Sequence, residues 1–347
     1  MTASKEELKN QIDKAFIKTP SDAQGRPIIP EINGEDGQKL TLTPLALNAK
    51  CVMGPNELIK NMRYAMSHGY PQFYKRDPHH GEIVLCGSGP SIENNVEDIK
   101  ALYANGHPVM AIKSTHDWLV DHGIRPQLAL AVDPTEKIAR LYQNPQPDCV
   151  YLIATQCHPE VYKALAGYNV VIWNAYTKKA EGYWKNYVKR KRRVDKVYFI
   201  NGGSTSGLRA ITMAYLMGYR KVHLFGFDSC LRSQTDNLLK ISGERNTKQT
   251  CVVVVEDRHF FCDPAMACQG NEFMKQVRHT PRLQVRVWGD GFIPYVSKLC
   301  GMQDDPQHVL EGEDWYALDS PLRGTMAPDP IQLPGEIEDN GEIGMVA

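Results

Sequence analysis

The sequence has no uninterrupted apolar run near the ~20 residues that a membrane-spanning helix requires. Its first residues, MTASKEELKNQIDKAF, are polar and lack the apolar core of a secretory signal. Net charge is also absent, because 40 Lys and Arg residues balance 40 Asp and Glu residues. No overall field therefore attracts nucleic acid or an anionic membrane. We expect a cytoplasmic protein without a membrane partner.

The 9 cysteines lack the spacing of a metal site. Cys262 and Cys268 are too far apart for a CxxC knuckle, and no second pair matches them. Four others lie in or beside apolar runs, where a reduced cysteine packs as a small hydrophobic residue: Cys86, Cys149, Cys230 and Cys251. We therefore expect reduced cysteines and no zinc.

One segment, WKNYVKRKRRVDK, concentrates basic charge between Lys189 and Arg193. Such a run can contact nucleic acid, but no aromatic residues alternate with it for base stacking. The expected role is a solvated helix end, with nucleic acid as the less favoured alternative.

From residue 81, short apolar runs alternate with helical segments. Several runs are apolar throughout, which is typical of strands covered by helices on both faces. The predicted strands are 82–87, 108–113, 128–133, 150–155, 169–174, 196–201, 221–228 and 283–289. The predicted helices between them are 92–105, 115–122, 135–142, 158–166, 178–190, 204–217 and 270–279. This alternation predicts a doubly wound, mostly parallel α/β sheet over residues 81–302.

Three segments depart from this rhythm. Residues 1–80 form a predicted N-terminal accessory segment, with helices near 4–17 and 54–69, through which the chain can form a homo-oligomer. Residues 240–268 read as a β-hairpin excursion or lid. Residues 303–347 are acidic and proline-rich, and we expect an extended tail there.

The first predicted strand ends in a glycine-rich loop: Gly87, Ser88, Gly89, Pro90 and Ser91. Small residues allow close approach of a phosphate, and free amides at a helix start favour an anion. The loop has neither the lysine of a P-loop nor the third glycine of a dinucleotide loop, since Ile92 stands at that position. A tight turn without a ligand is the alternative reading.

A second loop, NGGSTSG, repeats the arrangement of strand, small polar residues and apolar helix. Its hydroxyls can donate to a phosphate or sugar, or its glycines can serve only for packing. Two such loops in one sheet favour a ligand of nucleotide size. The candidate binding residues here are Asn201, Gly202, Gly203, Ser204, Thr205 and Ser206.

Other strand ends deliver groups that can act in chemistry, because ligands of open α/β sheets bind at the carboxyl ends of the strands. Asp133 and Asp228 follow the apolar runs LALAV and HLFGF, and each can bind Mg²⁺, a ribose hydroxyl or a proton, or merely cap the next helix. Lys113 and His116 follow the second strand. His116 is a candidate acid or base, with a structural hydrogen-bonding role as the alternative.

Three segments taken in order resemble a known family: VLCGSGPSIENNVEDIKAL, HGIRPQLALAVDPTEKIARLY and GGSTSGLRAITMAYLMGYRKVHLFGFDSCL. They are similar to the 6-hydroxymethylpterin diphosphokinase MptE-like family, which also includes motility-accessory-factor glycosyltransferase-like proteins. The resemblance covers residues 80 to 300 approximately. The layout also looks like the bacterial sialyltransferases with a Rossmann-like fold, although Lys113 stands where those enzymes usually carry asparagine.

The resemblance implies a nucleotide-dependent transferase with a Rossmann-like fold. Its kinase type implies Mg²⁺ and ATP, with diphosphoryl transfer to a small hydroxylated acceptor. Residues 87–91 would then hold phosphates, while Asp133 and Asp228 would hold metal or substrate. The glycosyltransferase type implies a nucleotide sugar and a small-molecule or glycan acceptor, deprotonated by a carboxylate or histidine. A non-catalytic binding or structural protein on the same scaffold is the third alternative.

Overall fold

The computed structural model describes residues 54–176, 202–232, 258–280 and 282–299, together with six short segments. These short segments are 28–29, 199–200, 238–239, 244–245, 251–255 and 345–346. Several predictions fall outside the described residues: the helices at 4–17 and 178–190, Asn201, the basic run Lys189–Arg193 and most of the 303–347 tail.

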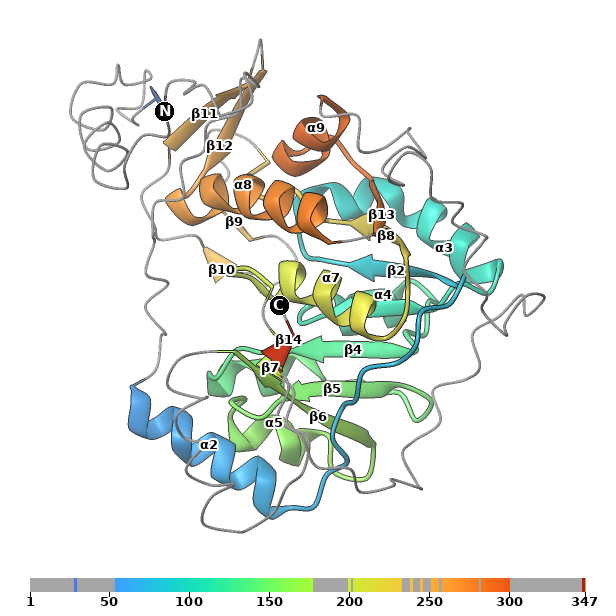
Figure 1. Cartoon of the computed structure of the whole chain (residues 1–347), viewed down its shortest axis with the longest axis vertical. Coiled ribbons are helices and arrows are strands. Elements are labelled where there is room, and N and C mark those ends of the chain that lie inside the picture. The colour runs from blue at the N-terminus through green and yellow to red at the C-terminus, as the bar shows by residue number, and fades with distance from the viewer. Residues whose placement is uncertain are drawn as a thin grey trace.

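A nine-stranded sheet forms the centre of the molecule, in the order β13-β8-β2-β3-β4-β5-β6-β7-β14 (Figure 1). Every neighbouring pair in this sheet is parallel. Its strands are β2 (Glu82–Cys86), β3 (Val109–Ile112), β4 (Leu128–Ala131), β5 (Val150–Ala154), β6 (Asn169–Ala175), β7 (Phe199–Ile200), β8 (Lys221–Phe225), β13 (Gln284–Val287) and β14 (Met345–Val346). Each of the predicted strands is present, so the predicted parallel α/β sheet is confirmed; only the short edge strand β14 was not predicted.

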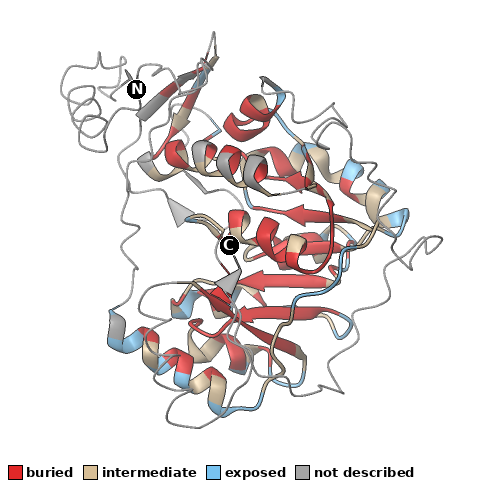
Figure 2. Ribbon diagram, in the orientation of Figure 1, coloured by how far each residue is buried: buried red, intermediate tan, exposed pale blue. Residues whose placement is uncertain are grey.

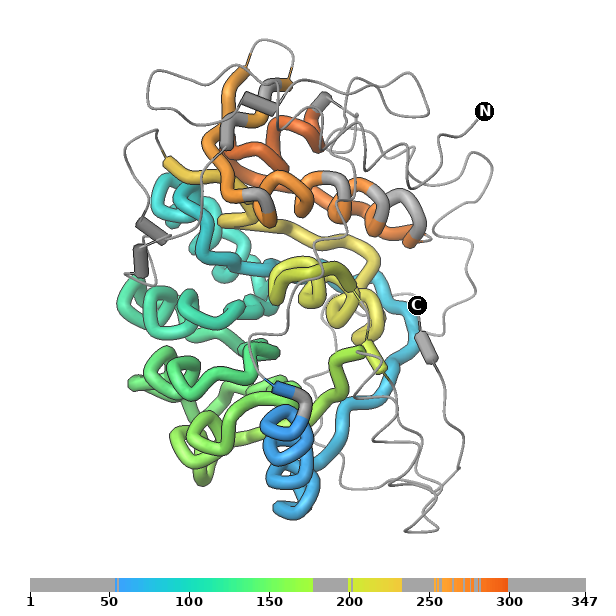
Figure 3. Tube along the Cα trace, turned by 90° about the vertical axis from the view of Figure 1, so that its left-hand side faces the viewer, coloured from blue at the N-terminus to red at the C-terminus, as the bar shows by residue number. Residues whose placement is uncertain are grey.

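Helices cover both faces of the sheet. The carboxyl ends of the strands point to the left in Figure 1, and Figure 3 looks onto them, with α3, α4 and α5 on one side and α7 on the other. The elements are α2 (Pro55–Ser67), η1 (Pro90–Asn95), α3 (Val96–Ala104), α4 (Thr115–Asp121), η2 (Glu136–Leu141), α5 (Pro159–Ala164), α7 (Ser206–Leu216), α8 (Pro264–His279) and α9 (Phe292–Leu299). Among the described residues, no helix has the length and apolarity that a bilayer crossing needs.

Three local predictions differ from the structure. The segments predicted as helices at 92–105 and 135–142 begin or run as 3₁₀ helix, at η1 and η2. Helix α8 begins at Pro264, within the predicted excursion, because Asp263 caps it by accepting the Met266 amide at 2.7 Å. Helix α9 was not predicted at all.

The predicted excursion contains the expected hairpin. β11 (Cys251–Val255) pairs antiparallel with β12 (Arg258–Cys262), and β1 (Ile28–Ile29) adds to β11 in parallel. The Leu231 amide donates to the Phe261 carbonyl at 2.6 Å, which joins the hairpin to the chain that follows β8.

The core follows the sheet. Residues of β2 to β5 are buried almost throughout, because helices cover both faces (Figure 2). The cysteines whose side chains the structure describes are free and buried: Cys86, Cys149, Cys157, Cys230, Cys262 and Cys268. Packing on both sides therefore leaves the strand ends as the places where polar side chains reach a ligand.

Candidate functional site

The crossovers diverge between β2 and β8, because the chain leaves β2 toward β3 on one side and leaves β8 toward β13 on the other. In open α/β sheets this is where ligands bind. Here the two strand ends are joined by their backbones: the Gly87 amide donates to Phe225 at 2.7 Å, and the Gly89 amide donates to Gly226 at 2.8 Å. Gly226 adopts φ +66°, and a Cβ there would collide with the Gly87 carbonyl. The glycines of the first loop thus serve close backbone packing.

Asp228 lies beneath this loop. It is 1% exposed, and its Oδ2 accepts the Ser91 amide at 2.8 Å, so the carboxylate satisfies a free amide at the start of η1. Burial raises the pKa of Asp228; the Ser91 hydrogen bonds oppose that shift, and Asp290 adds repulsion. The Ser91 amide, predicted to face a phosphate, is therefore held by a carboxylate of the protein itself.

Ser88 is the exposed residue of the loop. The Gly87 and Gly89 amides donate to backbone carbonyls and the Ser91 amide donates to Asp228, whereas the Ser88 amide makes no backbone hydrogen bond within the described chain. Its N–H and hydroxyl are the donors of this loop that a ligand can reach.

A charged pair lies beside the loop, at the ends of β3 and β4. Lys113 Nζ is 3.2 Å from Asp133 Oδ2, and the Thr135 amide donates to Asp133 Oδ1 at 3.0 Å. The two charged side chains are 30% and 27% exposed, so both face solvent in part. Lys113 adopts φ +56°, an uncommon conformation for a residue with a side chain and one that clusters at functional sites.

The pair sets the charge of Asp133. Burial alone would raise the pKa of this carboxyl, but the Lys113 charge and the Thr135 hydrogen bonds outweigh burial and lower the pKa. Asp133 is therefore a stable anion, suited to hold a cation or a sugar hydroxyl. A carboxylate with this shift is a weak general base at neutral pH.

The second glycine loop meets α7 and α8. Thr205 caps α7 by accepting the Leu208 amide at 3.2 Å. Ser204 donates from its amide (3.0 Å) and its hydroxyl (2.6 Å) to Oε2 of Glu272, a residue of α8 that sequence reasoning missed. Gly202 and Gly203 pack against α7, where Cβ atoms would crowd residues of that helix. Ser206 begins α7 and is buried.

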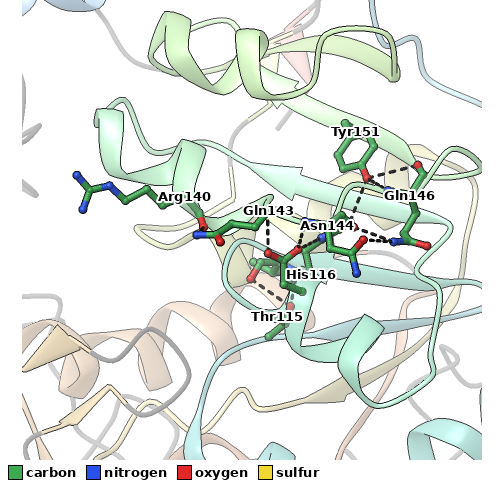
Figure 4. Close-up of polar contacts among 9 residues, drawn as sticks. Thr115, His116, Arg140, Gln143, Asn144, Gln146 and Tyr151 are labelled. Atoms are coloured by element: carbon green, nitrogen blue, oxygen red, sulfur yellow. Dashed lines mark hydrogen bonds and ion pairs between the residues drawn. The ribbon is translucent and has the colours of Figure 1, made fainter.

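His116 lies inside the protein, with both ring nitrogens engaged (Figure 4). Its Nδ1 is 2.7 Å from Asp117 Oδ1 and its Nε2 is 3.1 Å from the Tyr151 hydroxyl. The side chain is 0% exposed, and burial lowers the pKa of the imidazole despite the neighbouring Asp117. Asp117 also accepts the Gln143 amide at 2.8 Å. This environment favours the structural role, and the predicted acid–base role gains no support from the geometry.

The two candidate metal ligands lie apart. Asp133 follows β4 and Asp228 follows β8, with β2 and β3 between them. Three strand spacings of ~4.8 Å place the two strand ends about 14 Å apart, too far for both carboxylates to hold one Mg²⁺. Within the described residues, no three His, Cys, Asp or Glu side chains converge as a metal cluster. Asp133, with its partly exposed oxygens, is the better fit to a Mg²⁺ ion that also binds substrate phosphates.

A side chain of α2 contacts the turns after β4 and β5. Asn61 Nδ2 donates to the Gln156 carbonyl at 3.0 Å and to the Pro134 carbonyl at 3.4 Å. These two hydrogen bonds connect the turn that follows Asp133 to α2. No sequence signal identified Asn61, because its role depends on where α2 packs.

Comparisons with known proteins fit this fold. The chain is similar to the MAf glycosyltransferase from Magnetospirillum magneticum AMB-1, with 16% identity and a TM-score of 0.50; the match covers 68% of this chain and 37% of that one. The chain thus spans little more than a third of that protein, and at this identity the likeness concerns the fold alone. No curated protein matches.

Two further solved structures are much less similar to this chain. A protein from Lactobacillus plantarum matches with a TM-score of 0.18 and 17% identity, over 42% of this chain and 62% of that one. The yhdH oxidoreductase from Salmonella enterica matches with a TM-score of 0.15 and 15% identity, over 52% and 64% of the two chains.

The family comparison is more informative. The sequence pattern of one family matches residues 56–234, a range that includes the GSGPS loop, the Lys113–Asp133 pair and Asp228. The match also takes in α2, which contributes Asn61. More than half of the chain is covered, and the chain therefore belongs to the 6-hydroxymethylpterin diphosphokinase MptE-like family.

Proposed function

We propose that this protein is a nucleotide-dependent transferase that moves a diphosphoryl group from ATP, with Mg²⁺, to a hydroxyl of a small acceptor. The observation that carries the proposal is the half-buried Lys113–Asp133 pair, 3.2 Å apart, at adjoining strand ends beside the exposed Ser88. Membership of the family supports transfer chemistry.

In this proposal the residues position charge. Lys113 holds phosphate oxygens, since its ammonium is a compact cation at the strand end. Ser88 donates its amide and hydroxyl to the same group. A Mg²⁺ ion held by Asp133 and the phosphates supplies charge neutralisation.

The reaction balances without a covalent enzyme intermediate. The acceptor oxygen bonds to the β-phosphorus, the bond from that phosphorus to the α-phosphate oxygen breaks, AMP leaves and the hydroxyl proton passes to solvent. Such transfer depends on alignment and electrostatics more than on a strong base. The lowered pKa of Asp133 suits a residue that stays charged throughout.

Glycosyl transfer from a nucleotide sugar is the second candidate. One observation favours it: both oxygens of Asp133 already accept hydrogen bonds, from Thr135 and Lys113, which leaves this carboxylate less free for a metal. A metal-independent transfer would use the same loops to hold the nucleotide of the donor.

Thermal shifts with ATP, CTP, CMP, UDP-sugars and CMP-sugars, each with and without Mg²⁺, test the proposal. A ligand at one hundred times its Kd stabilises the fold by about 2.7 kcal/mol. Stabilisation by ATP that requires Mg²⁺ supports diphosphoryl transfer, whereas preference for a sugar nucleotide supports glycosyl transfer. No response to any nucleotide would leave the non-catalytic alternative.

Two variants localise the effect. Lys113→Met removes the cation of the proposed site and should abolish the nucleotide shift. Lys163→Met is the matched control, because Lys163 forms an exposed ion pair with Glu160 at 2.7 Å. An equal loss in both variants would contradict the site.

A further inference from the structure

The side chain of Thr115, which the sequence did not single out, bonds to the ends of both β2 and β3. The ladder of these strands ends where Cys86 faces Ala111. At this point Thr115 Oγ1 accepts the Ile112 amide at 2.8 Å and donates to the Cys86 carbonyl at 2.7 Å. One hydroxyl thus bonds to both strands, and Thr115 is 0% exposed.

Beyond this rung the two strands separate. Gly87 continues along β8, through its 2.7 Å bond to Phe225, and Lys113 continues along β4, through its 3.1 Å bond to Leu130. The residue after Gly87 is Ser88, whose amide has no backbone partner in the described chain. The chains that carry Ser88 and Lys113 therefore diverge directly after the point that the Thr115 hydroxyl joins.

Thr115 also fixes the turn that carries Lys113. It is the first residue of α4, two residues after Lys113, and the His116 amide donates to the Lys113 carbonyl at 3.2 Å. The φ of +56° at Lys113 is costly for a residue with a side chain, so the surrounding bonds must maintain it. Three hydrogen bonds surround the backbone of this residue. The Lys113 amide donates to Leu130, the Lys113 carbonyl accepts from His116, and the amide of the preceding Ile112 donates to Thr115.

We infer that Thr115 is a positioning residue for the proposed nucleotide site. Its hydroxyl fixes the fork between β2 and β3, and so holds Ser88 and the Lys113–Asp133 pair at the spacing a phosphate requires. The residue contacts no ligand itself. The inference rests on the proposed function for its purpose, whereas its geometric claim can be tested without any ligand.

The test compares Thr115→Val with Thr115→Ser. Valine has the shape of threonine without the hydroxyl, and serine retains the hydroxyl. Thr212→Val is the matched control: Thr212 is buried in α7 and its Oγ1 accepts Gln276 Nε2 at 2.8 Å, so this variant also removes a buried hydroxyl that forms a hydrogen bond.

The first readout is amide hydrogen exchange of the full-length protein, measured without ligand. Thr115→Val should speed the exchange of the Ile112 amide, which loses its acceptor, and of the Lys113 amide in the turn that follows. Thr115→Ser and Thr212→Val should leave both rates unchanged. Unchanged rates in Thr115→Val would overturn the inference.

The second readout is the Kd for ATP with Mg²⁺. Thr115→Val should weaken binding about tenfold, the effect of about one buried hydrogen bond, and Thr115→Ser should restore it. If the native protein binds no nucleotide, the proposed function fails while amide exchange still decides the role of Thr115. Should Thr115→Val not fold, amide exchange in the native protein decides: Ile112 must exchange far more slowly than Ser88, and equal rates would refute the role of Thr115.

Discussion

Asp133 and Asp228 occupy equivalent places in the sequence pattern and opposite environments in the structure. Each follows an apolar parallel strand of the same sheet. Asp133 is partly exposed, pairs with Lys113 and has a lowered pKa. Asp228 is buried under the GSGPS loop and has a raised pKa.

The difference arises from the neighbouring strands. At the end of β4, Lys113 delivers a cation and the turn stays open to solvent. At the end of β8, glycines let the backbones of two loops close over Asp228: Gly89, Gly289 and Gly291 all lie so near that a Cβ on any of them would meet its carboxylate or the Ser91 hydroxyl. One aspartate is placed to meet a ligand, and the other holds the loop together.

The largest predicted effect comes from a substitution that disturbs the packing around Asp228. In Gly89→Ala, the new Cβ would collide with Asp228 Oδ2 and lie 2.6 Å from the Gly226 carbonyl. Neither buried group can move freely, so the free energy of unfolding should fall by about 3 kcal/mol. Urea unfolding measures it.

The control is Gly54→Ala. Gly54 precedes a helix-starting proline, as Gly89 does, with φ −61° and ψ 153° against φ −67° and ψ 155°. Its Cβ would meet only Glu57, at 3.8 Å. A change below about 1 kcal/mol is expected there, and equal losses in the two variants would show that crowding at Asp228 is not the cause.

The sheet could be predicted because apolar runs covered on both faces leave a plain signal, and every predicted strand has its counterpart. The row of polar strand ends followed from that sheet. What could not be predicted is how its members pair. Asn61 and Glu272 reach the site from α2 and α8, whose positions are set by packing between distant segments. The burial of Asp228 likewise depends on glycines that come from two separate loops, one after β2 and one after β13.

A second prediction uses a third carboxylate to sharpen the comparison. Glu82 begins β2 and therefore lies at the amino-terminal ends of the strands, away from the candidate site. Its Oε2 accepts from His223 Nε2 at 2.9 Å, and its Oε1 accepts from Lys221 at 3.1 Å. The His223 hydrogen bond, ahead of Lys221, lowers the pKa of Glu82 to about 2. Glu82→Gln should therefore cost on the order of 2 kcal/mol at pH 7, after reduction for partial exposure.

The pH dependence of that cost follows from its sign. A carboxyl with a lowered folded pKa stabilises the protein above its unfolded pKa of 4.5, and this contribution is lost as the pH falls toward 2. Urea unfolding of Glu82→Gln provides the measurement. Glu97→Gln is the control, because Glu97 forms only an exposed ion pair with Lys100 on a helix. Nucleotide binding should be unaffected, and a loss of binding in Glu82→Gln would contradict the assignment of the site to the carboxyl ends of the strands.

The smallest effect is the most direct test of the two aspartates. The lowered pKa of Asp133 stabilises the native state above an unfolded pKa of 3.8 and loses that effect as the pH falls through the folded value. The raised pKa of Asp228 acts in reverse: the native state loses stability as the pH rises from 3.8 through the folded value. The stability difference between native protein and Asp133→Asn should grow with pH, and that between native protein and Asp228→Asn should shrink. Urea midpoints between pH 3 and pH 7 give the sign of each slope. Slopes of the same sign would mean that the two carboxylates share one environment, and the division between a ligand-facing and a loop-holding aspartate would fail.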